Sequence, residues 1–489
     1  MQDDKNRGSR IFSNFIWRFA ERGGAQIVSF IVSVVLARIL EPETYGTIAL
    51  VTVFLAILQV FVDSGLGNAL IQKKDADNID FSTVFFANIA FCIILYAIMF
   101  LAAPFIGLFY HDMSLVPIVR ALSLILIVSG VKNVQHAYVS RNMLFRKFFL
   151  ATLMGTLLSG VIGIVLAKLG YGVWALIAMQ LLNVTIDTII LWFTVRWRPD
   201  MVFSFERLKE LFSYGSKILA SNLLDVGYNN IWQLIIGKLY TPAELAYYNK
   251  GNNLPNVLVS TINTSVDSVL LPVMSKEQDH RKTLKSMTRR AIKVSTYVMA
   301  PLMMGMAFAA SNIVVLLLTE KWTACIPYLI IFCITYMFYP INTANLNVIK
   351  AMGRSDIFLK MELLKKAIGI IILIITMRFG VMVMAYGLLV SALIGQVINV
   401  YPNNKLLDYG FFEQLKDIFP NIVMAVIMGI VVSVVPQIGG SVVITLVVQV
   451  FVGIVVYSIE SVVTKNETFY YLLDVVKRML RNLRKKESK

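Results

Sequence analysis

The chain is short of charged residues. Asp, Glu, Lys and Arg make up only 15% of its 489 residues, against roughly 25% in a typical soluble protein. Apolar residues make up 57%, and fourteen membrane helices of about 20 residues each would use roughly 280 positions, close to that share. Little chain is left for a domain outside a membrane. The composition therefore excludes a large soluble enzyme, a secreted disulfide scaffold and a nucleic-acid-binding module.

Cysteine and histidine are also scarce. Cys92, Cys325 and Cys333 all lie in apolar runs, which predicts small buried hydrophobic side chains and no disulfide framework. The three histidines are scattered and give no spacing typical of a metal site or of an activated nucleophile. No G-x-x-x-x-G-K-[ST] motif occurs, so the chain has no P-loop for ATP hydrolysis. We expect no enzyme activity, no cofactor and no metal site.

Long apolar segments dominate what is present. Most are long enough to cross a bilayer as tilted helices, and they lie near 15–40, 45–62, 82–109, 115–139, 149–167, 173–195, 211–237, 251–275, 290–318, 324–348, 358–378, 381–402, 418–436 and 440–463. The sequence thus predicts an all-α integral membrane protein with about fourteen transmembrane helices. The first, seventh and eighth segments fit least well, because polar residues interrupt them.

The basic residues predict the orientation of the chain. The net charge is +16, and Lys and Arg concentrate in the loops after even-numbered spans, as in 141–147, 196–209 and 276–285. Loops after odd-numbered spans hold almost none. Because basic loops stay on the cytoplasmic side, both termini are predicted to be cytoplasmic in a multi-pass protein.

The C-terminal segment 468–489 has the pattern of an amphipathic basic helix. Leu472, Leu473, Val476 and Leu480 share one helical face, and Lys and Arg residues flank it. Such a helix lies on the inner leaflet, held by its apolar face and by attraction to anionic lipid. We expect it to act as an anchor with no role in binding a substrate.

An internal repeat of about 200 residues is visible. The segment ARILEPETYG at 37–46 aligns with GKLYTPAELA at 237–246, and VDSGL at 62–66 aligns with VDSVL at 266–270. Later YGVWAL at 171–176 aligns with FGVMVM at 379–384. The offset grows from 200 to 204 to 208, and this order makes chance matches improbable.

Each repeat contains six spans, so both copies cross the membrane in the same sense. This predicts two six-helix lobes from a parallel repeat, with a cavity between them. The predicted domains are an N-terminal lobe at 1–199, a C-terminal lobe at 200–405, spans 13 and 14 at 406–467, and the cytoplasmic tail at 468–489.

Polar residues within apolar spans are the candidate binding residues, because each one is costly in lipid unless it has a partner or a wet cavity. In the first span Arg18, Arg22 and Gln26 are spaced i, i+4 and i+8 and share a face. The equivalent seventh span carries Lys217, Asn222, Asp225, Tyr228 and Asn229. The eighth carries Lys250 and the amide stripe Asn249, Asn252, Asn253 and Asn256.

Two interpretations of these residues remain open. Arg18 and Arg22 could extend to lipid headgroups from the end of a span, and the amides could form hydrogen bonds between helices. Alternatively they line a polar, net-positive cavity, in which amides and tyrosines bind sugar hydroxyls and cations bind phosphate. Asp225 is the candidate acid for coupling to an ion or proton, although a structural salt bridge with Lys250 is an equal alternative.

The motifs LARILEPETYG, DSGLGNALIQKK and LLPVMSK resemble those of the polysaccharide-exporting flippases of O-antigen and capsule synthesis. These belong to the multidrug/oligosaccharidyl-lipid/polysaccharide exporter superfamily. The resemblance covers nearly the whole chain and implies movement of an undecaprenyl-pyrophosphate-linked oligosaccharide from the inner to the outer leaflet of a bacterial plasma membrane. It gives pyrophosphate-binding roles to Arg18, Arg22, Lys250 and Lys217.

The same resemblance implies membrane lipids, a polysaccharide polymerase and chain-length proteins as candidate partners, and sodium or proton coupling, but no nucleic acid. Two other functions stay open at this point. An ion-coupled multidrug extruder of the same superfamily would favour an acidic, aromatic cavity, whereas the candidate residues here hold more cations than acids. A non-transporting scaffold for glycan-synthesis enzymes would tolerate Arg22→Ala and Lys250→Ala.

Overall fold

The structure is a computed structural model that describes residues 24–64, 66–438 and 440–487, and all regular elements in these ranges are helices. The predicted all-α membrane fold is therefore confirmed. The contacts divide the chain into two compact units, the first ending at Ala246 and the second beginning at Tyr247. Each unit is described by itself below.

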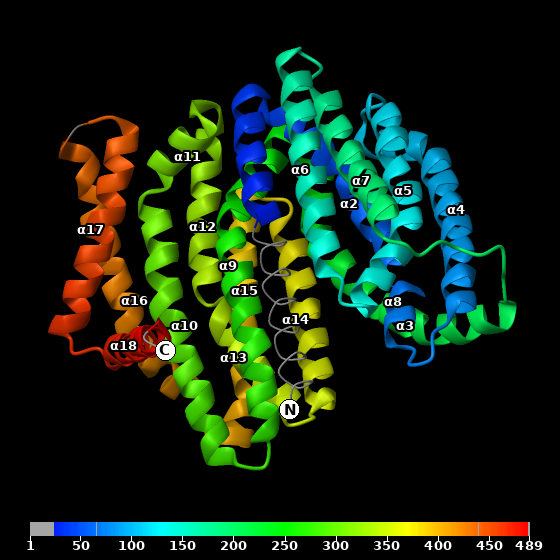
Figure 1. The fold of residues 1–489 in the computed structure, drawn as a ribbon. Helices are drawn as coiled ribbons and strands as arrows, with labels where there is room; N and C mark the ends of the chain where they lie inside the picture. Colours follow the sequence, from blue (N-terminus) through cyan, green and yellow to red (C-terminus); the bar gives the residue numbers. More distant parts are fainter. Residues whose placement is uncertain (1–23, 65, 439, 488–489) are drawn as a thin grey trace. The chain divides into compact units, whose positions relative to one another are not determined.

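The first unit is built on helices that pack side by side (Figure 1). Within it α4 packs on α5, α6 packs on α7, and α2 packs on α8. The elements are a helix at Gly24–Ile39, then α2 (Pro42–Ser64), α3 (Leu66–Gln72), α4 (Asn78–Tyr110), α5 (Leu115–Arg141), α6 (Phe145–Lys168), α7 (Val173–Thr194) and α8 (Phe205–Leu239).

The core of the first unit lies toward one end of the bundle and is rich in aromatic rings. Phe81 and Phe85 of α4 pack against Trp197, with ring centroids 5.7 and 6.2 Å apart. Phe148 and Leu191 belong to the same buried cluster. Such rings bury large areas and prefer edge-to-face or tilted contacts, so they fix the α7–α8 connection against α4.

The second unit is also helical and includes two short 3-10 helices, η1 and η2. Its elements are α9 (Pro242–Lys276, which begins in the first unit), α10 (Arg281–Phe308), α11 (Ala310–Leu318), the 3-10 helix η1 (Glu320–Cys325), α12 (Ile326–Met337), α13 (Tyr339–Ala351), α14 (Ser355–Thr376), α15 (Val381–Leu407), α16 (Phe411–Val434), η2 (Val435–Ile438), α17 (Val442–Val463) and α18 (Glu467–Glu487). The predicted tenth span is broken at Phe338, because Pro340 in the first turn of α13 cannot continue the hydrogen bonds of α12.

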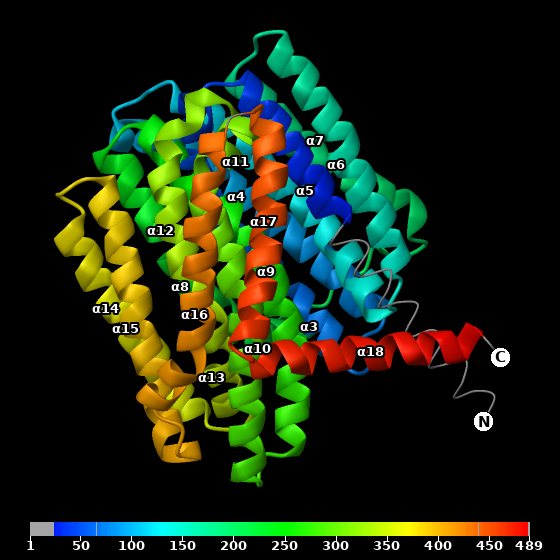
Figure 2. The same cartoon turned by 90° about the vertical axis from the view of Figure 1, so that its left-hand side faces the viewer.

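Helix α18 runs across the end of α17 and α10 within the second unit and not along them (Figure 2). Helix formation over Glu467–Glu487 confirms the helical part of the prediction for the tail. Tyr470, Leu473 and Val476 on it are 46%, 38% and 51% exposed. This exposed apolar face is typical of a helix that lies in a membrane interface.

Eleven helices in the described residues are long and apolar enough to cross a membrane, so the count of fourteen spans is not confirmed. The other three predicted segments are also helical where they are described, but they differ in composition or length. The described part of the first is short, at Gly24–Ile39. The amides of α8 and the charges Lys360, Glu362, Lys365 and Lys366 of α14 lower the hydropathy of the other two.

The repeat has counterparts in the local structure. Pro42 and Pro242 are the first residues of α2 and α9, a position that suits proline because its missing N–H needs no partner there. Gly172 and Gly380 both have a positive φ, 53° and 106°, directly before α7 and α15. The two compact units divide at Ala246 because α8 packs on α2, α3 and α4. The lobe boundary at 199/200 remains a prediction from the repeat.

Candidate functional site

The candidate residues of the first span fall mostly outside the described residues. Arg18 and Arg22 are not described. Gln26 lies in the helix Gly24–Ile39, where its side chain is exposed. The binding of a pyrophosphate by Arg18 and Arg22, and of a glycan by Gln26, therefore remains a prediction.

Helix α8 carries the candidate residues of the seventh span. Asn222, Asp225 and Asn229 follow i, i+3 and i+7 spacing, which places them along one face of the helix. Asn222 and Tyr228 are half-buried, while Asp225 and Asn229 are exposed. Lys217 belongs to the same helix, but its side chain is not described.

Lys250 lies two turns into α9, roughly 12 Å along the axis from Pro242. Its Nζ is 5.4 Å from the ring centroid of Trp322, which is fully buried in η1. The Trp322 ring also meets Tyr247 edge-on, with centroids 6.0 Å apart. A cation–π contact stabilises an ammonium group at a site removed from water, so the Trp322 ring is a favourable neighbour for the Lys250 amine inside an apolar helix bundle.

The structure divides the amide stripe of α9. The hydroxyl of Tyr336 on α12 donates a hydrogen bond to Asn252 Oδ1, which fits the alternative of a hydrogen bond between helices. Asn249 is half-buried, and Asn253 and Asn256 are exposed. Asn252 therefore contributes to the packing of α9 against α12, whereas the amides of Asn253 and Asn256 stay accessible.

One intramembrane ion pair was not predicted. Lys132 of α5 and Asp187 of α7 form a salt bridge of 3.1 Å, with side chains 24% and 13% exposed. Asp187 is the single charge of the predicted span 173–195, and Lys132 shares the predicted span 115–139 with one other charge, Arg120. Such isolated charges are the signal that could have identified the pair. The second carboxylate oxygen of Asp187, Oδ1, is buried and has no hydrogen-bond partner in the described residues.

Polar groups of neighbouring helices surround this pair. Asp63 near the end of α2 accepts hydrogen bonds from Gln59. The charge of Lys132 also interacts with the carboxylate of Asp63. Asn133, next to Lys132, donates to the carbonyl of Val62. The Lys132–Asp187 salt bridge thus lies close enough to the end of α2 for the charge of Lys132 to act on Asp63.

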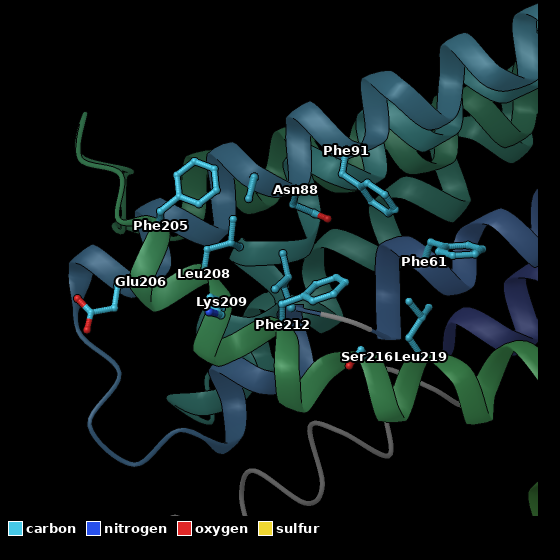
Figure 3. A pocket seen from close by; sticks show the side chains of 12 residues that line it. Phe61, Asn88, Phe91, Phe205, Glu206, Leu208, Lys209, Phe212, Ser216 and Leu219 are labelled. Carbon is cyan, nitrogen blue, oxygen red and sulfur yellow. The ribbon is translucent and has the colours of Figure 1, made fainter.

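An apolar groove of about 660 Å³ opens between α4, the α2–α3 junction and the first half of α8. Phe91 and Phe212 point into it from α4 and α8, and Phe61 closes the side toward α2 (Figure 3). Asn88 and Ser216 supply polar groups of the wall, and Glu206 and Lys209 lie on it near the start of α8. Such a lining accepts hydrocarbon far better than a sugar.

Ionic contacts fasten the start of α8 to the beginning of α4. The fully buried carboxylate of Asp80 pairs with Lys73 at 3.2 Å and with Arg207 at 3.1 Å. Arg207 also pairs with Asp77 at 2.8 Å, and Lys73 with Glu210 at 2.9 Å. We name these five residues the α8 clamp.

Two groups of the clamp have shifted pKa values. The hydrogen bond from the backbone N–H of Asp80 and the charge of Arg207 hold the pKa of Asp77 below its usual 3.8. The hydrogen bond to Glu210 raises the pKa of Lys73 above 10.5. Both shifts favour the charged forms that the clamp needs.

The connection between α7 and α8 carries exposed apolar side chains. Met201 is 93% exposed, and Phe203 and Phe205 are 46% and 79% exposed. Its backbone is nevertheless fixed, since the N–H groups of Asp200 and Ser204 donate to Ser82 Oγ and Thr83 Oγ1 at 3.0 and 3.1 Å. A rigid, apolar connection of this kind suits a membrane surface rather than open water.

The fold and these polar groups define a multi-pass helical membrane protein with charges held inside its apolar bundles. A family model described as "Polysaccharide biosynthesis protein" matches residues 35–327, more than half of the chain. The chain belongs to this polysaccharide biosynthesis protein family.

Individual relatives are distant but cover most of the chain. The chain is 24% identical to the lipopolysaccharide biosynthesis protein WzxC of Escherichia coli (strain K12) over 75% of this chain and 74% of that one. It is 26% identical to the teichuronic acid biosynthesis protein TuaB of Bacillus subtilis (strain 168), over 68% of each chain. The solved structure of the lipid II flippase MurJ in an inward closed conformation aligns with a TM-score of 0.74 and 16% identity, covering 94% of this chain and 99% of that one. That likeness shows a shared fold.

Proposed function

We propose that this protein is a flippase that moves an undecaprenyl-pyrophosphate-linked oligosaccharide from the inner to the outer leaflet of a bacterial plasma membrane. The observation that carries the proposal is the presence of charged and amide groups inside apolar helices, in a chain of the polysaccharide biosynthesis family. The WzxC and TuaB relatives, named for cell-surface polysaccharides, and the fold shared with a lipid II flippase support it.

The physical task is to carry a charged, sugar-bearing head group through hydrocarbon, where it could not go unaided. The positive charges that bind the pyrophosphate come from Lys250, Lys217, Arg18 and Arg22. Gln26, Asn222, Tyr228, Asn229, Asn249, Asn252, Asn253 and Asn256 offer donors and acceptors to the sugar hydroxyls. The apolar groove of α4 and α8 is suited to hydrocarbon at the side of the first unit. The protein acts by alternating access and performs no covalent chemistry.

Orientation and coupling complete the proposal. Both termini are cytoplasmic, as the distribution of Lys and Arg predicts. Asp225, which is exposed on α8, is the candidate acid for sodium or proton coupling. A polysaccharide polymerase and chain-length proteins would receive the flipped product.

The test uses liposomes that contain the full-length protein and a lipid-linked oligosaccharide. The fraction of glycan accessible to an added glycosidase is followed with time. Protein-containing vesicles should expose inner-leaflet glycan far faster than empty ones. Lys250→Gln should slow this step by about ten-fold, the loss of one charge-assisted interaction, whereas Lys168→Gln at the exposed end of α6 should not. Equal rates in protein-containing and empty vesicles would refute the flippase.

A second experiment addresses the cell. Deleting the gene should cause lipid-linked oligosaccharide to accumulate on the inner leaflet. Arg22→Ala and Lys250→Ala should fail to restore surface polysaccharide. Full restoration by both variants would instead favour a scaffold without transport activity.

A further inference from the structure

A second pocket lies in the second unit, where α18 begins beside α10. It has a volume of about 510 Å³, well within the range of small-ligand sites. From α10 it is lined by Ser286, Arg289, Arg290, Lys293 and Val294, and from α18 by Glu467, Thr468 and Tyr471. Spacing of i, i+3, i+4 and i+7 places the polar residues of α10 on one face of that helix.

The charges around this pocket are not evenly balanced. The cations are Lys285, Arg289, Arg290 and Lys293, and the acids are Glu413, Asp417 and Glu467. Asp417, with a side chain only 4% exposed, pairs with Arg289 at 2.7 Å and with Lys293 at 3.6 Å. Arg290 forms no ion pair in the part of the chain that the structure describes. One positive charge is therefore left without an acid.

Arg290 is held in a defined position despite lacking an acidic partner. Its guanidinium carbon lies 5.0 Å from the ring centroid of Tyr471 on α18. Stacking on a ring leaves the edge of the guanidinium fork available, and that edge matches the two oxygens of a phosphate. Lys293 lies on the same face and bridges to Glu467 at 3.0 Å.

The start of α18 does not itself offer a free anion site. Asn466 Oδ1 already accepts hydrogen bonds from the N–H groups of Thr468 and Phe469, at 2.9 and 3.3 Å. Asn466 Nδ2 also donates to Asn421 Oδ1 of α16 at 2.9 Å. The side-chain cations of α10 must therefore supply any attraction for an anion.

From this geometry we infer that the pocket between α10 and α18 binds the phosphate of an anionic glycerophospholipid. The basic pocket lies where an amphipathic helix with an exposed apolar face joins the bundle. Basic pockets at such places attract anionic headgroups from the negatively charged inner leaflet. Val294 and the ring of Tyr471 give the glycerol end of the lipid an apolar wall.

A lipid bound there would contact both helices. Arg290 and Lys293 belong to α10, while Tyr471 and Thr468 belong to α18. The bound phosphate would hold α18 against the bundle and set the angle at which its apolar face meets the membrane. This role is independent of the proposed flippase function, because it concerns the attachment of the C-terminal helix and not the path of the substrate.

The experiment uses the full-length protein purified in detergent with equal amounts of phosphatidylglycerol and phosphatidylcholine. Native mass spectrometry gives the ratio of the two lipids retained. Wild type should retain phosphatidylglycerol preferentially. Arg290→Gln should lower the ratio by about five-fold, the effect of one cation near an anionic lipid surface. Lys282→Gln, an exposed residue of the same helix that does not line the pocket, should leave the ratio unchanged.

A competition arm separates a lipid from free phosphate. Inorganic phosphate in excess should not displace the retained phosphatidylglycerol, because it lacks the glycerol and acyl chains. Full displacement, equal retention of phosphatidylcholine, or an Arg290→Gln ratio equal to that of wild type would each overturn the proposal. If Arg290→Gln does not fold, Tyr471→Leu removes the stacking ring on α18 and should lower the same ratio.

Discussion

Lys132 and Asp187 are 55 positions apart in the sequence and join α5 to α7 by a 3.1 Å salt bridge inside the first unit. Two charges removed from water are costly, and their attraction offsets that cost only while both are present. The nearby Asp63 adds a second acid to the same region. Each of these two residues therefore stabilises the first unit only while the other is present.

We expect each single substitution of this pair to destabilise the protein strongly. Lys132→Met or Asp187→Leu leaves one uncompensated, partly buried charge, which should lower the free energy of unfolding by about 3 kcal/mol. The double variant should lie within about 1 kcal/mol of wild type, since apolar side chains replace both charges. Denaturant unfolding of the detergent-solubilised protein measures this. Lys168→Met is the control for loss of a cation, and single variants as stable as this control would contradict the expectation.

Close packing at Gly251 gives a second prediction. A Cβ at this position of α9 would lie 2.6 Å from Tyr328 Cβ and 2.8 Å from the backbone N of Leu329. Backbone atoms cannot yield cheaply, so Gly251→Ala should destabilise the protein by about 1–3 kcal/mol. Gly227→Ala in α8, where a Cβ meets no atom within 4 Å, should instead stabilise by about 0.5–1 kcal/mol. Thermal unfolding of the two variants measures both changes in stability. Unfolding temperatures that shift in the same direction in both variants would contradict the prediction.

Sequence alone predicted the helices well because their causes are local. Apolar runs define the spans, Pro42 and Pro242 mark helix starts, and Pro340 marks a break. The partners of the polar residues could not be predicted, because they come from distant parts of the chain. Arg141 was interpreted as a cytoplasmic loop cation, yet its guanidinium donates to the carbonyls of Leu70, Lys73 and Lys74.

The candidate site shows the same limit. Spacing placed the four amides of α9 on one face, but only the structure assigns Asn252 to Tyr336 of α12. Composition also marked α8 as a weak span without indicating that it packs against α2, α3 and α4. A periodic pattern specifies which face a residue occupies and leaves open what lies opposite.

Three buried amides in the second unit support a third prediction. Asn345 of α13 and Gln414 of α16 exchange two hydrogen bonds of 2.9 Å, and Asn403 of α15 donates to Asn345 Oδ1 at 2.7 Å. Asn345→Ala would leave both partners short of hydrogen bonds in a site with almost no exposure. We expect a loss of about 2–5 kcal/mol in the free energy of unfolding. Asn404→Ala, at the exposed neighbouring position, should cost little, and an equal loss in both variants would count against this network.

The α8 clamp predicts a pH dependence with two limits. Because the pKa of Asp77 in the folded protein lies below 3.8, its contribution to stability is complete above about that pH and is lost as the pH falls through the folded value. The pKa of Lys73 is raised above 10.5, so its contribution is complete below that pH and is lost as the pH rises further. The start of α8 should therefore stay attached to α4 across the whole range between these values.

Hydrogen exchange in the first turns of α8, corrected for the intrinsic effect of pH, measures that attachment. Asp77→Asn keeps an amide that can still cap α4 but removes the charge. In this variant the rise in exchange rate at acid pH should therefore be smaller, and the rise at alkaline pH should be unchanged. Arg207→Gln takes one of two cations from the buried Asp80 carboxylate and should therefore speed exchange at neutral pH. Lys209→Gln changes the neighbouring charge outside the clamp. If it accelerates exchange as much as Arg207→Gln, the attachment depends on general surface charge and not on the contacts with Asp77 and Asp80.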